Sequence, residues 1–271
     1  MNTLWQRKDI LQAGGGALRP GGMELTRRGL ALCAGCCGLE SSALVLDLGC
    51  GAGAALSLLL AEGYQAFGVD ENIQPALTDR PGCRGRTIRA DIARLPLADA
   101  KADALLCECV LSLLPDPAAA LKEWHRVLRP GGALIMSDFY LREPESLPPL
   151  DARRDASCPG VSRLNGRGMG GARLSDPRPD GLLSPGLSQS GCCLDGALFA
   201  REWEELLRGA GFLLRAREDH SAGLAALAAR LVWYGRGDLP EIFGLCSPGK
   251  NRPRGARRYG YGLWTAQKEA A

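Results

Sequence analysis

The chain has 271 residues, 46% of them hydrophobic, and a formal net charge of +3 at pH 7. This length and composition can build a core for one large domain, or for one domain with a smaller lobe. The charge is too small and too dispersed to indicate nucleic-acid binding. The sequence has neither an apolar run near the ~20 residues of a membrane span nor the apolar segment of a secretory signal, which predicts a cytoplasmic protein.

The first part of the chain is a polar, Gly-rich lead followed by a short helix predicted near residues 23–36. We interpret residues 1–42 as an N-terminal cap segment. From residue 43 onward, apolar strand-like runs alternate with helical runs, which is typical of β-α-β units and a mainly parallel sheet. Residues 43–140 are therefore the predicted core. Its strands are predicted at 43–48, 65–70, 85–91, 102–110 and 133–140, its helices at 54–63, 72–78 and 117–128, and a turn at 129–132.

The alternation stops at residues 141–198, which are dense in Pro, Gly, Ser and Arg. We predict a mobile insertion there, with residues 142–190 outside the core. Regular structure returns in residues 199–271, the predicted C-terminal part of the core. Helices are predicted at 199–212 and 223–234, and strands at 212–218 and 259–268.

A glycine-rich turn follows the first core strand in "VLDLGCGAG", residues 45–53. Gly49, Gly51 and Gly53 let the backbone approach a ligand and lead that ligand to a helix N-terminus. Two ligand classes use such a turn, a dinucleotide and S-adenosylmethionine. Asp47 precedes the turn, and its carboxylate repels a pyrophosphate but suits a ligand that carries positive charge. The pattern therefore favours S-adenosylmethionine.

Two further aspartates end predicted strands. Asp70 ends the second strand, where a carboxylate can accept hydrogen bonds from ribose hydroxyls in either ligand class. Asp91 ends the third strand, where a nucleotide laid across the sheet places its adenine. Each aspartate alone also fits a helix cap or an Asx-turn. Three of them at the ends of successive strands favour a binding site, because ligands of open α/β sheets bind at those ends.

The stretches "VLDLGCGAG", "GVD", "ADIARLPL" and "EWHRVLRPGGALIMSDFY" together resemble the small-molecule class I S-adenosylmethionine-dependent methyltransferases over roughly residues 43–140. The resemblance implies an α/β fold with a doubly wound, Rossmann-like sheet of seven strands, the last one antiparallel, and a variable cap. It also implies site roles: Gly49, Gly51 and Gly53 around the methionine moiety, Asp70 on the ribose, Asp91 and Ile92 at the adenine, and Glu108 beside the transferred methyl group.

Eleven cysteines without a predicted secretory signal indicate reduced thiols rather than a disulfide framework. Residues 191–212 resemble a segment of the arsenite methyltransferase branch, which implies that Cys193 supplies a thiolate to trivalent arsenic. Soft thiolates suit a soft metalloid. The chain lacks the Tyr-Gly-Cys-type segment that this branch carries before the first strand. Cys246 is a second candidate for a substrate ligand, although no motif fixes it.

Other uses of the thiols stay open. Cys107 and Cys109 have strand spacing and are predicted to pack as small hydrophobic side chains on one face. A zinc site from Cys33, Cys36 and the pair at 192–193 is conceivable, but adjacent cysteines chelate awkwardly, and no metal is predicted.

We predict a methyltransferase that uses S-adenosylmethionine and acts on a small-molecule acceptor, such as a trivalent arsenical or another soft nucleophile. No nucleic-acid or membrane partner is expected. A nicotinamide-dependent oxidoreductase and a non-catalytic, thiol-rich binding protein with the same fold are the alternatives. The sequence identifies neither a catalytic residue, nor the acceptor atom, nor the oligomeric state.

Overall fold

The computed structural model describes residues 19–78, 80, 82–142, 193–194, 196–234 and 259–270. Cys246 and residues 143–192 of the predicted insertion lie outside these described residues. The mobility of the insertion and the domain boundaries therefore stay predictions. None of the described helices combines the length and the apolarity that crossing a bilayer requires.

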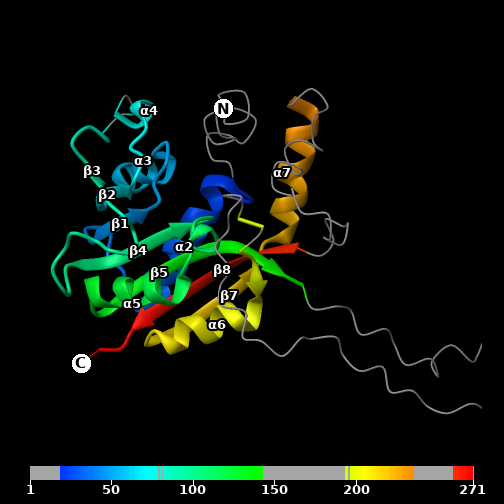
Figure 1. Cartoon of the computed structure of the whole chain (residues 1–271). Helices are drawn as coiled ribbons and strands as arrows, with labels where there is room; N and C mark the ends of the chain where they lie inside the picture. The colour runs from blue at the N-terminus through cyan, green and yellow to red at the C-terminus, as the bar shows by residue number, and fades with distance from the viewer. Residues whose placement is uncertain are drawn as a thin grey trace, which may run out of the picture. The chain divides into compact units, whose positions relative to one another are not determined.

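One mixed β-sheet organises the described part of the chain (Figure 1). Its strands are β1 (Leu44–Leu48), β2 (Gln65–Asp70), β3 (Thr87–Arg89), β4 (Ala102–Glu108), β5 (Leu128–Leu141), β6 (Leu198–Phe199), β7 (Phe212–Asp219) and β8 (Tyr259–Lys268). Their spatial order is β3-β2-β1-β4-β5-β8-β7. Strands β1 to β5 pair in parallel, and β8 runs antiparallel to both of its neighbours. The predicted seven-stranded sheet with an antiparallel last strand is confirmed, and the two-residue β6 adds a short pair at the end of β5.

Helices cover both faces of this sheet. The described helices are α2 (Gly22–Cys37), α3 (Ala54–Ala61), α4 (Pro75–Thr78), α5 (Pro117–Val127), α6 (Ala200–Gly209) and α7 (Ser221–Tyr234), with a 3-10 turn, η2 (Leu111–Leu113). Helices α5 and α6 lie on one face of the sheet, and α2 and α3 lie on the other (Figure 1). The first pair buries Trp124 and Trp203 in one core cluster, and the second pair buries Leu25 and Leu56 in the other. Both faces of the central strands are thus buried, which explains their nearly continuous apolar sequences.

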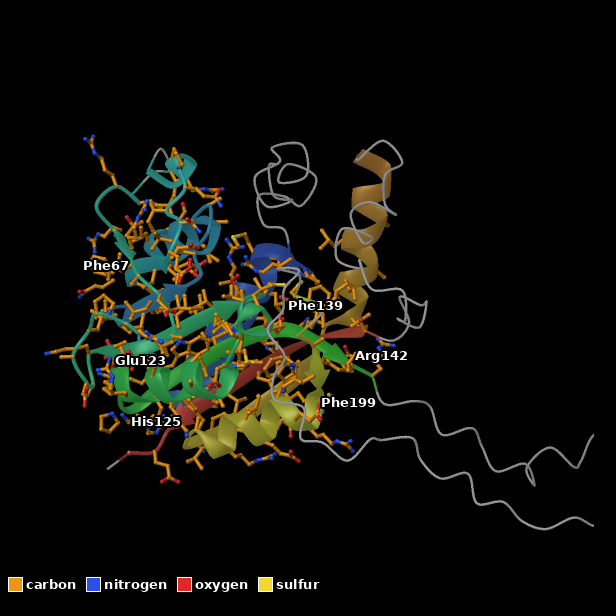
Figure 2. All side chains as sticks on the ribbon, in the orientation of Figure 1. Phe67, Glu123, His125, Phe139, Arg142 and Phe199 are labelled. Atoms are coloured by element: carbon orange, nitrogen blue, oxygen red, sulfur yellow. The ribbon has the colours of Figure 1, made fainter. Side chains whose placement is uncertain are left out.

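Aromatic residues fix the contact between β5 and β8. Phe139, which Figure 2 labels on β5, packs edge-on against Tyr261 with the two ring centroids 5.1 Å apart. The neighbouring Tyr140 lies over Gly260, where an added Cβ would come within 2.2 Å of the phenol ring. The antiparallel pairing of β8 therefore depends on a glycine opposite a large ring.

The turn predicted at residues 129–132 is wrong in one respect. Strand β5 already begins at Leu128, which pairs with Ala102, and the register shifts before Ala133 pairs with Ala104. The Arg-Pro-Gly-Gly stretch is therefore an irregularity within the strand. Gly131 takes a left-handed φ of +76°, which favours glycine. Residues 129–132 do have the composition of a turn. The residues on both sides of them pair with β4, however, so the whole segment forms one long strand.

Candidate cofactor and substrate cleft

The carboxyl ends of β1, β2 and β4 border a cavity of about 1120 Å³. Its walls come from the glycine turn after β1, from the loops after β2 and β3, and from the segment after β4. Arg19, just ahead of α2, adds a further wall. Nearly all of the residues predicted to bind the cofactor line this cavity: Asp47, Gly49, Gly51, Asp70, Asp91, Ile92 and Glu108.

The three glycines of the turn serve different ends. Their φ angles are +71° at Gly49, +50° at Gly51 and +73° at Gly53. A Cβ at Gly49 would lie 2.6 Å from Val110, and a Cβ at Gly53 would lie 2.8 Å from Leu77. Packing therefore requires glycine at both. A Cβ at Gly51 would clash with nothing, since its nearest neighbour, Gln74 Nε2, would lie 3.9 Å away, and Gly51 lines the cavity with its bare backbone.

The Asp47 side chain caps the start of helix α3, and this cap does not use both of its carboxylate oxygens. The residue is 3% exposed and accepts a backbone hydrogen bond from Leu56 in the first turn of α3. Its Oδ2 is buried and has no hydrogen-bond partner among the described residues. Burial, followed by the negative charge of Glu108, raises the pKa of Asp47 to about 7. Buried polar groups are rarely left without a partner. A ligand with a cationic hydrogen-bond donor would supply the hydrogen bond that this oxygen lacks.

Arg19 contributes to the cavity wall and Thr26 supports it, although no sequence motif predicted them. Arg19 Nη2 pairs with Glu108 Oε2 at 2.6 Å and also donates to Thr26 Oγ1. Thr26 in turn donates to Glu108 Oε1 at 3.0 Å. The side chains of Arg19 and Glu108 are 10% and 5% exposed, and Arg19 Nε has no partner among the described residues. Burial raises the pKa of Glu108, against the opposing charge of Arg19.

The charges at this wall do not cancel when both acids are ionised. Asp47 and Glu108 contribute two buried carboxylates, and Arg19 contributes one guanidinium. An excess of negative charge in a secluded site favours a ligand with net positive charge.

The other predicted aspartates hold loops as well as lining the cavity. Asp70 Oδ2 accepts from the Gly51 backbone N–H at 2.8 Å, and its Oδ1 accepts from Asn72 at 2.9 Å. Asp91 Oδ1 accepts from Ala93 at 2.8 Å, which is the Asx-turn that was the simpler reading of this residue. Local caps and cavity walls are thus built from the same carboxylates.

Asp138 fixes the cavity wall formed after β4. It is fully buried and accepts hydrogen bonds from the backbone N–H of Ser112 at 2.9 Å and from its hydroxyl at 2.7 Å. Burial raises the pKa of Asp138 to about 6, although these hydrogen bonds oppose the shift. Because Ser112 belongs to η2, the carboxylate anchors the turn whose last residue, Leu113, lines the cavity together with the following Leu114.

The thiols are distributed differently from the prediction. Cys109 does not share a strand face with Cys107, because β4 ends at Glu108 and Cys109 has a φ of +61°. Cys109 lines the cavity, while Cys107 is fully buried in the core. Cys193 is 5% exposed and is not among the described residues that line the cavity.

The segment that carries Cys193 nevertheless crosses the carboxyl edge of the sheet. Strand β6 pairs with Tyr140 and Leu141 at the end of β5. Gly196 lies so close to the η2 backbone that an added Cβ would fall 1.8 Å from the carbonyl oxygen of Ser112. Within the described ranges, no group of three or more His, Cys, Asp or Glu side chains is arranged to hold a metal ion.

Comparison with known proteins gives these features a context. Residues 46–136 match the family described as "Methyltransferase domain". The chain is 30% identical over 220 residues to an arsenite methyltransferase from Aquipseudomonas alcaligenes, a match that covers 72% of this chain and 54% of that protein. It therefore spans about half the length of that relative. A trans-aconitate 2-methyltransferase from Azoarcus sp. is 29% identical, with 70% of this chain and 78% of the relative covered.

Solved structures share the fold. The phosphoethanolamine N-methyltransferase 2 of Haemonchus contortus, determined with phosphomonomethylethanolamine and S-adenosylhomocysteine, superposes with a TM-score of 0.62 at 15% identity. The superposition covers 97% of this chain and 58% of that one. The matched relatives act on chemically different acceptors, so the comparisons agree on the fold and on the type of protein but not on a substrate.

Proposed function

The chain belongs to the class I S-adenosylmethionine-dependent methyltransferases, and from this premise we propose that its cavity binds S-adenosylmethionine and directs the methyl group to a small-molecule acceptor. The proposal rests on the buried Oδ2 of Asp47, which has no hydrogen-bond partner among the described residues, and on the bare backbone of Gly51 in the same cavity. When bound, S-adenosylmethionine supplies an electrophilic methyl carbon on a sulfonium, and its tail carries an ammonium and a carboxylate. The ligand therefore has the net positive charge that this wall favours.

We assign the tail of the cofactor to the two unpartnered atoms. Asp47 Oδ2 would accept from the ammonium, and Arg19 Nε would donate to the carboxylate. Glu108 and Thr26 keep the guanidinium of Arg19 at the cavity wall by the ion pair and the hydrogen bond described above. Each buried group would then gain the partner that it lacks.

The nucleoside fits the remaining wall. Asp70 uses one lone pair of each carboxylate oxygen for backbone N–H groups, which leaves further lone pairs for ribose hydroxyls. Asp91 was predicted to end the third strand, but β3 ends at Arg89, and Asp91 and Ile92 line the cavity from the loop that follows, where we assign the adenine. Methyl transfer needs alignment and exclusion of water more than proton chemistry, and the apolar Leu113 and Leu114 side of the cavity contributes to both.

A nicotinamide dinucleotide fits the same wall less well. Its pyrophosphate would lie at the glycine turn, close to the buried carboxylate of Asp47. The backbone N–H of Gly51, which a phosphate would need, already donates to Asp70. Both facts disfavour an anionic ligand at this turn.

For the acceptor we propose a soft nucleophile, with a trivalent arsenical as the first candidate. Support comes from the relative that is an arsenite methyltransferase, from the Cys109 thiol at the cavity wall, and from the segment of Cys193 at the same edge of the sheet. Cys246 stays a proposed ligand that lies outside the described residues. Thiolates are the ligands that soft metalloids prefer.

The test has two stages. Calorimetry with S-adenosylhomocysteine and with NADH should give binding of the first only. Methyl transfer from labelled S-adenosylmethionine should then be measured with arsenite, small thiols and carboxylic acids as acceptors. Transfer to arsenite that is lost in Cys193→Ser and Cys246→Ser supports the arsenical. Transfer to another acceptor corrects the substrate alone, and binding without transfer to any acceptor indicates a non-catalytic binding protein.

A further inference from the structure

Three cysteines gather in the last turns of α2. Cys33 is fully buried, Cys36 is exposed and Cys37 is half-buried. The sulfur atoms of Cys36 and Cys37 are 3.4 Å apart, and the side chains of Cys33 and Cys37 are also hydrogen-bonded. Cys37 therefore has two thiol neighbours within hydrogen-bonding reach.

This cluster lies away from the cofactor cavity. Helix α2 contacts the cavity wall through Thr26, and Cys37 follows about 16 Å further along the helix axis, from the rise of about 1.5 Å per residue. Gln267 donates to the carbonyl of Cys37 at 3.3 Å and to that of Gly131 at 2.8 Å. Gly131 precedes the regular part of β5, so the cluster is at the amino-terminal edge of the sheet.

The surroundings of the cluster favour a thiolate at Cys37. Hydrogen bonds from Cys33 and Cys36 and the positive charge of Arg215 lower the pKa of Cys37 to about 6, against the effect of burial. The shared hydrogen bond and burial raise the pKa of Cys33. Arg215 is held in place by two hydrogen bonds to Gln267 Oε1, at 2.9 and 2.6 Å. These surroundings favour the thiolate at Cys37 and the protonated thiol at Cys33.

We propose that the cluster is a site of oxidative modification, in which Cys37 is the nucleophile toward hydroperoxides and Cys33 is the thiol that resolves the product. The Cys37 thiolate attacks the peroxide oxygen, an S–O bond forms, and the O–O bond breaks. The sulfur is oxidised to a sulfenic acid, and the peroxide is reduced to an alcohol or water after taking up a proton. Cys33 then attacks that sulfur, an S–S bond replaces the S–O bond, and water leaves with the proton of the Cys33 thiol.

Helix geometry selects Cys33 as the partner. Adjacent Cα atoms are about 3.8 Å apart, shorter than the roughly 4.4–6.8 Å that ordinary disulfides span, which disfavours Cys36. Residues four apart on a helix have Cα atoms about 6 Å apart, which is within that span. The Cβ atoms must approach each other, and the last turn can give way there because the helix ends at Gly38, which has a left-handed φ of +67°.

Other thiols of the chain provide internal references. Burial raises the pKa of Cys50 and of Cys107, so both stay protonated near neutral pH. Cys36 is more exposed than Cys37 but lacks a lowered pKa, because burial and Cys37 raise it. Reaction at Cys37 before Cys36 would therefore report thiolate character rather than access.

The experiment uses the full reduced chain and hydrogen peroxide as the probe. Alkylation by iodoacetamide, followed by peptide mass spectrometry across pH 5–9, should show Cys37 reacting first, with half-maximal rate near pH 6. Arg215→Gln should move that midpoint to higher pH, and the matched surface change Arg208→Gln should not.

One equivalent of peroxide should give a Cys33–Cys37 disulfide in the unmodified chain and in Cys36→Ser, while Cys33→Ser should leave a sulfenic acid that dimedone traps.

Faster alkylation of Cys36 than of Cys37, or a midpoint near the ~8.5 of an ordinary thiol, would overturn the proposal. The unmodified chain alone gives both readouts, so the test does not depend on the folding of Cys33→Ser. A disulfide that involves only Cys36 would overturn the assignment of Cys33.

Discussion

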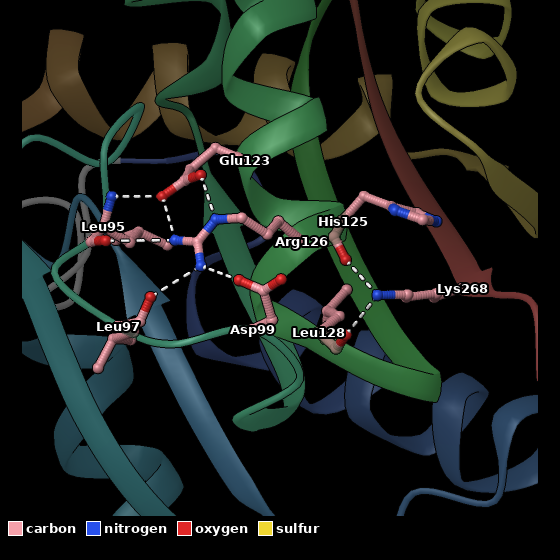
Figure 3. Close-up of polar contacts among 8 residues, drawn as sticks. All are labelled: Leu95, Leu97, Asp99, Glu123, His125, Arg126, Leu128 and Lys268. Carbon is pink, nitrogen blue, oxygen red and sulfur yellow. Dashed lines mark hydrogen bonds and ion pairs between the residues drawn. The ribbon is translucent and has the colours of Figure 1, made fainter.

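Two groups of charged side chains in this protein lie near opposite ends of the sheet and are built in opposite ways. At the end of α5, the guanidinium of Arg126 donates to Glu123 at 2.7 and 2.8 Å, to Asp99 at 2.6 Å, and to the carbonyls of Leu97 and Leu95 (Figure 3). Lys268 closes the same helix end by donating to the carbonyls of His125 and Leu128 (Figure 3). At the cavity, by contrast, Arg19 and Asp47 each keep a buried atom without a partner among the described residues.

This difference distinguishes charged groups that stabilise the fold from charged groups that can bind a ligand. A network such as that of Arg126 holds the loop after β3 and the end of α5 in place and has no need of a ligand. An unpartnered buried polar atom costs roughly 1–3 kcal/mol, a cost that a ligand can remove by supplying the missing hydrogen bond. The "HRVLRPGG" motif that carries part of the family resemblance belongs to the first group, and Asp47 belongs to the second.

The largest effect is expected for Asp47→Asn. Loss of the negative charge should weaken binding of S-adenosylhomocysteine about 10- to 100-fold, or roughly 1.4–2.8 kcal/mol, because the ammonium loses a charged acceptor. The ligand-free variant should at the same time be more stable at pH 8. The pKa of Asp47 is raised on folding, to about 7, so the unfolded chain releases this proton first, and the group lowers stability as pH rises from about 4 to 7.

Calorimetry and thermal unfolding measure the two effects of this substitution. A variant that binds as tightly as the unmodified chain would remove Asp47 from the binding site. Weaker binding with lower stability would instead indicate a disturbed cap of α3.

Gly51→Ala separates backbone strain from ligand exclusion. The alanine should lower the free energy of unfolding by about 1–2 kcal/mol because of the left-handed φ, and it should weaken S-adenosylhomocysteine binding about tenfold because its Cβ enters the cavity. Gly85→Ala is the matched control, since Gly85 has a φ of +74° and open space but does not line the cavity. Equal binding losses in the two variants would count against a ligand at Gly51.

Binding of S-adenosylhomocysteine should depend on pH through Asp47. The ammonium favours the ionised carboxylate, so binding releases a proton, and affinity should rise about five- to tenfold from pH 6 to 7.5. Calorimetry in two buffers of different ionisation enthalpy measures the released protons. Asp47→Asn should abolish the dependence, and a dependence that persists in this variant would assign it to another group.

The smallest effect is expected for Arg126→Gln, in the group of charged side chains at the end of α5. Its side chain is partly exposed, so solvent screens the lost ion pairs, and the melting temperature should fall by no more than about 2 °C. S-adenosylhomocysteine should bind as before. Weakened binding in this variant would mean that the two groups of charges are coupled through α5.

Much of the fold could be predicted because its determinants are local. Strands β2 and β8 have the predicted bounds, since apolar runs between polar or glycine residues specify short buried strands. The Arg-Pro-Gly-Gly stretch shows a feature that neighbouring residues alone do not determine, namely where strand β5 begins. Its residues have turn chemistry, but Arg129 pairs with Asp103 of β4 at 2.7 Å, and strand pairing extends to Leu128.

The sequence by itself determined the alternation of strands and helices, the glycine turn, and the carboxylates at the ends of β1, β2 and β4, because each depends on neighbouring residues. Only the tertiary structure decided which charges meet. Thr26 and Glu108 are 82 positions apart and share a hydrogen bond because α2 packs across the sheet, a contact that local periodicity does not encode. The same packing left Asp47 Oδ2 and Arg19 Nε without partners in the described part of the chain, and it placed Cys37 between two thiols. Burial and long-range contact are properties of the folded chain, and they give these side chains their chemistry.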